Sequence, residues 1–263
     1  MPGTTMKVRQ LSWSPVGSGP GSRRPMLVRR AAYQPSLAYV RLADDSVVPS
    51  LEDIRDVVDT LRGDRRVETL RTSALFPRSA DRFAAAGFTP ADTLCLLRAD
   101  LASRAILDAV AAQRRSRVRI ATMRRWNYEA AARVDRAAFG PSWGHDAAEL
   151  DDIRHATPLH RARFRYDQNS LLTRELRGFA IAGASTEHGY LQRLSVDPSL
   201  QRQGDGRALT VDALGWMARQ RVPDCLVNTS VDNDSALGLY GSIGFVPLRD
   251  HLSVMQLDVH QAA

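Results

Sequence analysis

The residues whose types and spacing best suit chemistry form a glycine-containing loop, Gln201-Arg202-Gln203-Gly204-Asp205-Gly206-Arg207. The loop follows a strand-like segment and precedes a segment whose apolar residues recur at helical spacing. Glycine lets a backbone approach an anion closely, and the first turn of a helix has unpaired N–H groups. Because the helix dipole also favours negative charge, the loop predicts a phosphate or pyrophosphate site.

Two other phosphate-binding loops do not fit these residues. A Walker loop needs a Gly-Lys-Ser/Thr sequence, and Lys7 is the only lysine of the chain. A dinucleotide-binding fingerprint needs a third glycine, at a position that Leu209 occupies here. The loop therefore belongs to a different class of phosphate site.

The elements that must position this loop make up the second half of the chain, residues 117–263. The apolar periodicity predicts strands at 118–122, 164–166, 178–184, 190–196, 225–229, 246–248 and 252–257. It predicts helices at 128–139 and 146–155, from the loop to about 219, and at 235–243. The result is a mixed α/β arrangement around one central sheet.

The first half shows a shorter pattern of the same kind. Residues 1–25 are rich in glycine, proline and serine and are expected to be disordered. Residues 26–101 predict strand, strand, helix, strand, helix and strand, and residues 102–116 predict a linker helix. Gly87-Phe88-Thr89-Pro90 matches Gly244-Phe245-Val246-Pro247, which indicates a duplicated domain. The alternative is that glycine and phenylalanine recur by chance after two helices.

Two motifs carry a resemblance to a known family. Gln201-x-x-Gly204-x-Gly206 follows Val196-Asp197-Pro198, and Asn233-x-x-Ala236-x-x-Leu239-Tyr240-x-x-x-Gly244-Phe245 lies downstream. In this order they resemble the two signatures of the GNAT superfamily of N-acetyltransferases, over about residues 117–259. The pattern is similar to the branch that acetylates the N-terminal alanine of a ribosomal protein. The tandem layout with a degenerate N-terminal copy is similar to that of mycothiol synthases.

The resemblance implies acetyl-CoA as acyl donor, no metal, and a role for each matching residue. The backbone of the strand at Leu194 and Val196 would pair with the pantetheine arm, and one N–H there would polarise the thioester carbonyl. The amides of 202–207 would hold the pyrophosphate. The implied cofactor-binding residues are Leu194, Ser195, Val196, Gln201, Arg202, Gln203, Gly204, Asp205, Gly206, Arg207 and Asn233. Tyr240 would protonate the departing thiolate, although its helical spacing also fits a core aromatic residue.

Three positions depart from the pattern of the family. Asp205 replaces an aliphatic residue between the glycines, so we expect its carboxylate to point away from the phosphates or to pair with an arginine. Asn228 stands where the branch often has a glutamate base, which favours an amine of low pKa or a water that relays the proton. The tail after Phe245 lacks the paired tyrosines of the ribosomal-protein branch, so the acceptor stays open between a peptide N-terminus and a small amine metabolite.

The N-terminal copy has lost the residues of the motifs. Phe83 stands at the position of Tyr240, and the position of Asn233 falls near Phe76. Where the glycine loop should lie, residues 44–49 contain two aspartates and no glycine. We therefore expect this half to be structural or to form a wall of the acceptor cleft.

Composition limits the partners of the chain. Its 263 residues carry a formal charge of +7, nearly all of the positive charge being arginine, and the composition is that of a soluble globular protein. The arginine run at 114–119 lacks interleaved aromatic residues, which favours a solvated linker over a nucleic-acid surface. No apolar run reaches the roughly 18–20 residues of a membrane span, and the N-terminus lacks the apolar stretch of a signal peptide. We expect a cytoplasmic location and no membrane partner.

The cysteines and histidines do not indicate a metal centre. Cys95 and Cys225 lie in apolar, strand-like runs, which predicts buried thiols rather than a disulfide or a metal site. Neither cysteine neighbours a histidine that could activate it as a nucleophile.

The function predicted from these residues is acetyl transfer from acetyl-CoA to a primary amine by direct attack. Trp143, Tyr190 and Gln192 are candidates for the acceptor side, with packing as the alternative for each. Asp205, Asn228 and the degenerate first copy leave open a non-catalytic acyl-CoA-binding regulatory or scaffold protein. A nucleic-acid-binding role rests on charge alone. The sequence leaves the oligomeric state open, a homo-oligomer included.

Overall fold

The computed structural model describes residues 14–16, 26–31, 34–44, 46–116, 118–166 and 175–260. The chain divides into two compact units: unit 1 holds residues 1–94 and 250–263, and unit 2 holds residues 95–249. The domains expected from the sequence, 26–101 and 117–263, follow one another along the chain, whereas this division assigns the end of the chain to unit 1. Strands β5 (Thr89–Asp100) and β11 (Val246–Asp258) therefore have residues in both units.

Unit 2 is built on a mixed sheet with the strand order β5-β10-β9-β8-β7-β6. Its further strands are β6 (Ile120–Thr122), β7 (Leu159–Tyr166), β8 (Leu176–Ala184), β9 (Gly189–Val196) and β10 (Asp224–Ser230). Strands β6 to β9 pair in antiparallel fashion, and β9 and β10 run parallel. Nearly every residue of β8 is buried, because helices cover both faces of the sheet.

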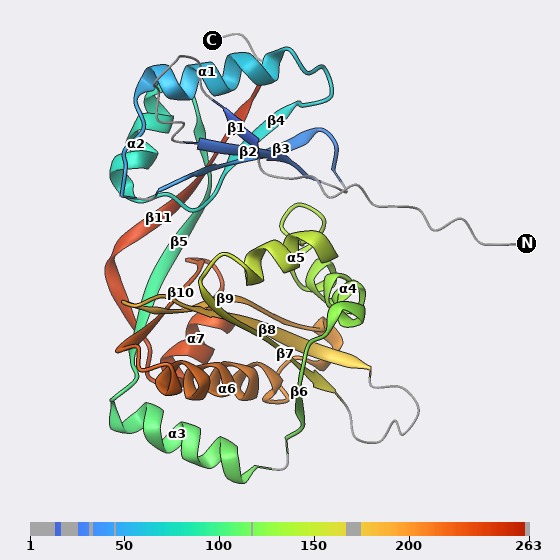
Figure 1. Ribbon diagram of the computed structural model, residues 1–263, viewed down its shortest axis with the longest axis vertical. Coiled ribbons are helices and arrows are strands. Elements are labelled where there is room, and N and C mark those ends of the chain that lie inside the picture. The colour runs from blue at the N-terminus through green and yellow to red at the C-terminus, as the bar shows by residue number, and fades with distance from the viewer. Residues whose placement is uncertain are drawn as a thin grey trace, which may run out of the picture. The chain divides into compact units, whose positions relative to one another are not determined.

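The helices of unit 2 form two layers (Figure 1). Helices α6 (Asp205–Arg219), α7 (Asp234–Ile243) and α3 (Arg104–Arg115) share a core with Ala180 and Ala182 of β8. Helices α4 (Tyr128–Phe139) and α5 (Ala147–Arg154) share a second core with Phe179 and Ile181. Successive residues of β8 thus serve opposite cores, as the alternation of side chains in a strand requires. Two short 3₁₀ helices, Arg125–Asn127 and Pro198–Leu200, complete the unit.

Unit 1 is a smaller sheet with helices on one face (Figure 1). Its strand order is β1-β2-β3-β4-β11, with β3 and β4 parallel and the other pairs antiparallel. The strands are β1 (Ser14–Val16), β2 (Met26–Arg30), β3 (Leu37–Leu42), β4 (Thr69–Thr72) and the last part of β11. Helices α1 (Leu51–Arg62) and α2 (Pro77–Ala85) pack their apolar faces on this sheet.

The two units end their last helix in the same way, as the repeated Gly-Phe motif predicts. Gly87 and Gly244 both follow a helix with a positive φ, of 93° and 116°. The N–H of Phe88 donates to the carbonyl of Phe83, and that of Phe245 donates to the carbonyl of Tyr240, each at 3.1 Å. In both units these two aromatic rings are in contact. Matching residues therefore occupy matching places, which supports duplication over chance recurrence.

The order of elements agrees with the sequence prediction, with differences in length. Strands β5 and β7 are longer than predicted, and the two strands predicted at 246–248 and 252–257 are one continuous strand, β11. The prediction of disorder was wrong for residues 14–16, which pair with β2, while the rest of 1–25 lies outside the described residues. Cys95 and Cys225 are buried free thiols, as predicted. Within the described part of the chain, no helix has the length and apolar character needed to cross a membrane.

Candidate functional site

The site begins where strands β9 and β10 part. These parallel strands pair at only two positions, Cys225 with Gly189 and Leu226 with Tyr190. On its other side β9 pairs with β8 throughout, but the register shifts so that Gln192 has no partner residue. Such a bulge bends a strand and increases its twist. Beyond the bulge, the edge of β9 that faces β10 is left without a paired strand.

Hydrogen bonds identify which residues of β9 face this open edge. The N–H of Asp197 donates to the carbonyl of Arg177 on β8, at 2.9 Å. The carbonyl of Val196 points the other way, since it accepts from Nε2 of Gln201 at 3.4 Å. Backbone groups alternate in direction along a strand, so Leu194 faces the same side as Val196. The open edge thus presents the backbone polar groups of Leu194 and Val196, two of the residues selected from the sequence.

The glycine loop lies at the end of this strand and turns into α6. Arg202 and Gly204 both have positive φ, of 65° and 85°, a conformation in which glycine carries no steric cost. Gly204 is the residue before α6, and it offers no side chain to cap the helix. The N–H groups of the first turn are therefore not satisfied by a cap and are available to an anion.

The close packing of Gly206 explains the second glycine. A Cβ atom built on Gly206 would lie 3.3 Å from Cδ2 of Leu239 and 3.7 Å from Cγ2 of Val196. Leu239 belongs to α7 and Val196 to β9, so the three elements meet at this point. A longer side chain here would fill the space between the loop and these two elements.

The charge of Asp205 is balanced by two arginines. Its side chain is only 4% exposed, and its carboxylate forms ion pairs with Nε of Arg177 at 2.7 Å and Nε of Arg165 at 3.0 Å. Both arginines come from the neighbouring strands β7 and β8. The expectation that this carboxylate pairs with an arginine is therefore confirmed, and two arginines take part. Its charge does not oppose an anion at the loop.

Arg177 also fixes the loop itself. Its Nη2 donates to Oε1 of Gln203 at 2.6 Å while its Nε holds Asp205. A single guanidinium thus joins two residues of the loop to β8. On the far side, Nη1 of Arg207 donates to Oγ of Ser242 at 3.1 Å, which joins the loop to α7. The loop is held from both directions.

The open edge and the loop line one pocket of about 660 Å³. Ten of the eleven cofactor-binding residues selected from the sequence line it: Leu194, Ser195, Val196, Gln201, Arg202, Gly204, Asp205, Gly206, Arg207 and Asn233. Gln203 does not, because its side chain turns to Arg177. Ala138 and Phe139 of α4 close one wall, and residues of α7 close another. The fold brings the selected residues together, and the role of each stays a prediction.

Asn233, at the start of helix α7, lines the pocket, whereas Tyr240, further along the helix, is buried in the core. Asn233 is the N-cap, and its Oδ1 accepts from the N–H of Ala236 at 3.1 Å, which leaves its amide NH₂ for other contacts. Tyr240 is 4% exposed, does not line the pocket, and packs against Phe245 with ring centroids 5.4 Å apart. Burial, and next the proximity of Cys225, raises the pKa of its hydroxyl well above the ordinary value, so the group stays protonated.

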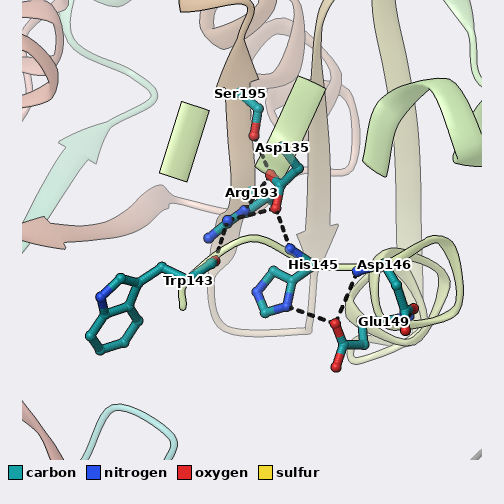
Figure 2. A network of polar contacts seen from close by, with 7 residues as sticks. All are labelled: Asp135, Trp143, His145, Asp146, Glu149, Arg193 and Ser195. Carbon is teal, nitrogen blue, oxygen red and sulfur yellow. Dashed lines mark hydrogen bonds and ion pairs between the residues drawn. The ribbon is translucent and has the colours of Figure 1, made fainter. Parts of the chain in front are cut away.

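A buried carboxylate that the sequence did not single out lies behind β9 (Figure 2). Asp135 of α4 is 0% exposed and accepts from Nε of Arg193 at 2.8 Å and from Nη2 at 2.7 Å. It also accepts from Oγ of Ser195 and from the N–H of His145. Burial alone would raise the pKa of Asp135, but the bonds from Arg193 and Ser195 outweigh it and hold the pKa below its usual value. The helical spacing of the sequence could have identified this residue, because Tyr128, Ala131 and Ala132 share its buried face.

The acceptor-side candidates are dispersed around this strand. Trp143 contributes its carbonyl, which accepts from Nη2 of Arg193 at 2.9 Å, while its indole points away from Arg193 (Figure 2). Gln192 lies at the bulge, and the ring of Tyr190 contacts His188. Asn228 is exposed on β10. In the described part of the chain, no group of three or more His, Cys, Asp or Glu residues is placed to hold a metal ion.

The matching helix start in unit 1 is closed by its own side chains. The N-cap of α1 is Ser50, whose Oγ accepts from the N–H of Asp53 at 3.1 Å. The Asp53 carboxylate in turn accepts from the N–H of Ser50 at 3.1 Å. This reciprocal cap supplies an internal negative charge where α6 leaves its amides open. The cap agrees with the loss of the glycine loop from this half of the sequence.

The ion pairs of Asp205 give the first testable prediction. Arg177→Gln removes one of the two buried cations and should lower the free energy of unfolding by about 2 kcal/mol, because Arg165 compensates only in part. The control Arg104→Gln removes an ion pair with Asp108 from a side chain that is 89% exposed, and should cost less than about 0.5 kcal/mol. Urea unfolding of both variants measures the difference. Equal stabilities would mean that the pair does not hold the loop.

Comparison with known proteins agrees with this geometry. Residues 128–245 match the acetyltransferase (GNAT) family. The chain is 30% identical over 106 residues to the ribosomal protein bS18-alanine N-acetyltransferase of Escherichia coli, a match that covers 38% of this chain and 72% of that protein. It is 33% identical over 75 residues to the mycothiol acetyltransferase of a Nocardioides species, which covers 28% of this chain and 25% of that protein.

A solved structure resembles the whole fold. A tandem GNAT protein from the clavulanic acid biosynthesis pathway matches 93% of this chain and 82% of its own with a TM-score of 0.60, at 14% identity. The likeness shows a shared fold, in which a tandem arrangement accounts for both halves of the chain. Together with the sequence relatives and the paired signatures, it shows that the chain belongs to the GNAT family of acetyltransferases.

Proposed function

We propose that this protein transfers the acetyl group of acetyl-CoA to a primary amine by direct attack. The observation that carries the proposal is the single pocket that joins the uncapped start of α6 to the open edge of β9. The first feature fits a pyrophosphate, and the second fits an extended chain with amide groups, such as pantetheine. A thioester donor that has both a pyrophosphate and an extended arm with amide groups matches the pocket better than a nucleotide without such an arm does.

The reaction needs only groups that this chain supplies and the two substrates. The amine nitrogen attacks the thioester carbonyl carbon, a C–N bond forms and the C–S bond breaks. A backbone N–H at the open edge of β9, at Leu194 or Val196, stabilises the negative charge that develops on the carbonyl oxygen. Tyr240 gives its hydroxyl proton to the departing thiolate, and water carries the proton that the amine loses back to the Tyr240 oxygen.

The acceptor is an amine that is already partly neutral at physiological pH. Asn228 offers no carboxylate to take a proton from the amine. An α-amine, with a pKa near 8, is about one tenth neutral at pH 7, whereas only about one lysine ε-amine in a few thousand is neutral. The E. coli and Nocardioides relatives are named for an alanine of ribosomal protein bS18 and for mycothiol. A peptide N-terminus or a small amine metabolite of low pKa fits this site.

The donor is tested by calorimetric titration of the protein with acetyl-CoA. We expect micromolar binding for the wild type, and at least about 100-fold weaker binding for Gly206→Glu, whose side chain would fill the space beside Leu239 and add negative charge. Ala218→Glu places the same charge at the exposed far end of α6 and should bind as the wild type does. Failure of the wild type to bind would refute the proposed function.

The acid is tested by Tyr240→Phe. Turnover should fall about 10²-fold or more, because a positioned acid is removed, while acetyl-CoA affinity stays the same. The ring stays in its core position beside Phe245, so packing is preserved. Because burial raises the pKa of Tyr240, wild-type turnover should not decline up to about pH 10. Unchanged turnover in the variant would assign Tyr240 to the core alone. A wild type that binds acetyl-CoA but acetylates no amine would favour a non-catalytic acyl-CoA-binding protein.

The acceptor class is tested with two peptides that differ in their only free amine. One has a free N-terminus and no lysine, and the other has a blocked N-terminus and one lysine. At pH 7 the release of free CoA thiol should be at least about tenfold faster with the first peptide, since far more of its amine is neutral. A peptide with both groups blocked gives the background. Faster reaction of the lysine peptide would show that another residue acts as base.

A further inference from the structure

We propose that Asp135 is a positioning residue that sets the β9 backbone on both sides of Leu194 for the thioester carbonyl. The inference rests on the proposed function and adds a residue to it that neither signature contains. Asp135 lies on α4, and it forms hydrogen bonds with the side chains of Arg193 and Ser195 on β9. These two residues flank Leu194, whose polar groups face the open edge.

Both oxygens of the Asp135 carboxylate accept two hydrogen bonds each. Oδ1 accepts from Nε of Arg193 and from Oγ of Ser195, and Oδ2 accepts from Nη2 of Arg193 and from the N–H of His145. A carboxylate offers about four acceptor positions, so each has a donor. A buried charge with this many directed bonds has little freedom to move. The Asp135 carboxylate therefore fixes the side chains of both Arg193 and Ser195.

The strand needs such an anchor because the sheet does not provide one on this side. Between Leu191 and Arg193 the pairing with β8 is broken by the bulge at Gln192, and pairing with β10 has already stopped at Tyr190. Beyond the bulge, β8 supports residues 193–196 along one edge, and on the side of β10 the strand depends on side-chain contacts. The guanidinium of Arg193 lies 3.7 Å from the ring centroid of Phe139, which lines the donor pocket. Asp135 thus orients a guanidinium that is packed between the pocket wall and the strand.

The same carboxylate joins β9 to the loop between α4 and α5. It accepts from the N–H of His145, and Arg193 donates to the carbonyl of Trp143 (Figure 2). The His145 imidazole in turn lies 3.5 Å from Oε2 of Glu149 at the start of α5. The network therefore sets the strand that faces the donor and this loop from one buried charge. Misplacement of β9 by a fraction of an ångström is enough to weaken an N–H bond to a carbonyl oxygen.

The test separates positioning from stability by use of a double variant. Asp135→Asn leaves Arg193 buried beside a neutral group, which should lower the melting temperature strongly. Asp135→Asn combined with Arg193→Gln removes both charges and should regain much of that loss. Asp212→Asn is the control, because it breaks ion pairs with Arg161 and Arg163, at 3.6 and 3.4 Å, that do not line the pocket.

The decisive measurement is the infrared frequency of the thioester carbonyl in bound acetyl-CoA labelled with carbon-13. The wild type and Asp212→Asn should lower this frequency relative to free acetyl-CoA, since an N–H bond polarises the carbonyl. Both Asp135 variants should lose at least about half of the shift and bind acetyl-CoA about tenfold more weakly. All variants should bind 3′-phospho-ADP, which lacks pantetheine, with affinity unchanged within about twofold, because only the glycine loop holds it.

Two outcomes would overturn the inference, and they are distinct from failure of the proposed function. A double variant that regains both its melting temperature and the full carbonyl shift would reduce Asp135 to a structural role. A single variant that keeps the full shift would do the same. If the wild type binds no acetyl-CoA, the proposed function itself fails, and the inference fails with it.

Discussion

The site depends on the early parting of two parallel strands. Backbone N–H and C=O groups in the interior must be paired, and β9 and β10 leave such groups open after two residue pairs. An open strand edge of this kind is stable when a ligand or solvent satisfies it and when neighbouring elements hold the strand in place. The arginine pair of Asp205 holds the loop that continues β9, and the buried Asp135 holds β9 beside the bulge at Gln192. Their common effect is to keep an incomplete sheet rigid.

Charge is handled in the same way on both sides of β9. A carboxylate is buried on each side, Asp205 at the loop and Asp135 behind the strand, and each is bound by at least one arginine of the sheet. Buried ion pairs contribute little net stability, but a broken pair costs much, so they fix geometry more than they add stability. The N-termini of α6 and α1 differ in how their backbone amides are satisfied. At α6 the amides are left open for an anion, whereas at α1 Ser50 and Asp53 occupy them.

Much of this could be predicted from the sequence, because local patterns determine it. The glycine loop, the helix after it and the strand before it follow from periodicity and backbone freedom, and ten of the selected residues do line one pocket. The partners of Asp205 could not be predicted, since Arg165 and Arg177 are far away in sequence and only the pairing of β7 with β8 brings them together. The burial of Asp135 was not predicted because its neighbours indicate an apolar helix face. The strand β1 was not predicted because three residues among many glycines and prolines are too few to show the alternating apolar pattern of a strand.

The contrast between the two helix starts has a thermodynamic consequence. A ligand that binds the folded state stabilises it in proportion to the logarithm of its concentration. An anion at the open start of α6 would couple folding to the supply of that anion, whereas the closed cap of α1 offers no such site. A ligand bound at the start of α6 would therefore offset part of the cost of a destabilising mutation. The closed start of α1 provides no compensation of this kind.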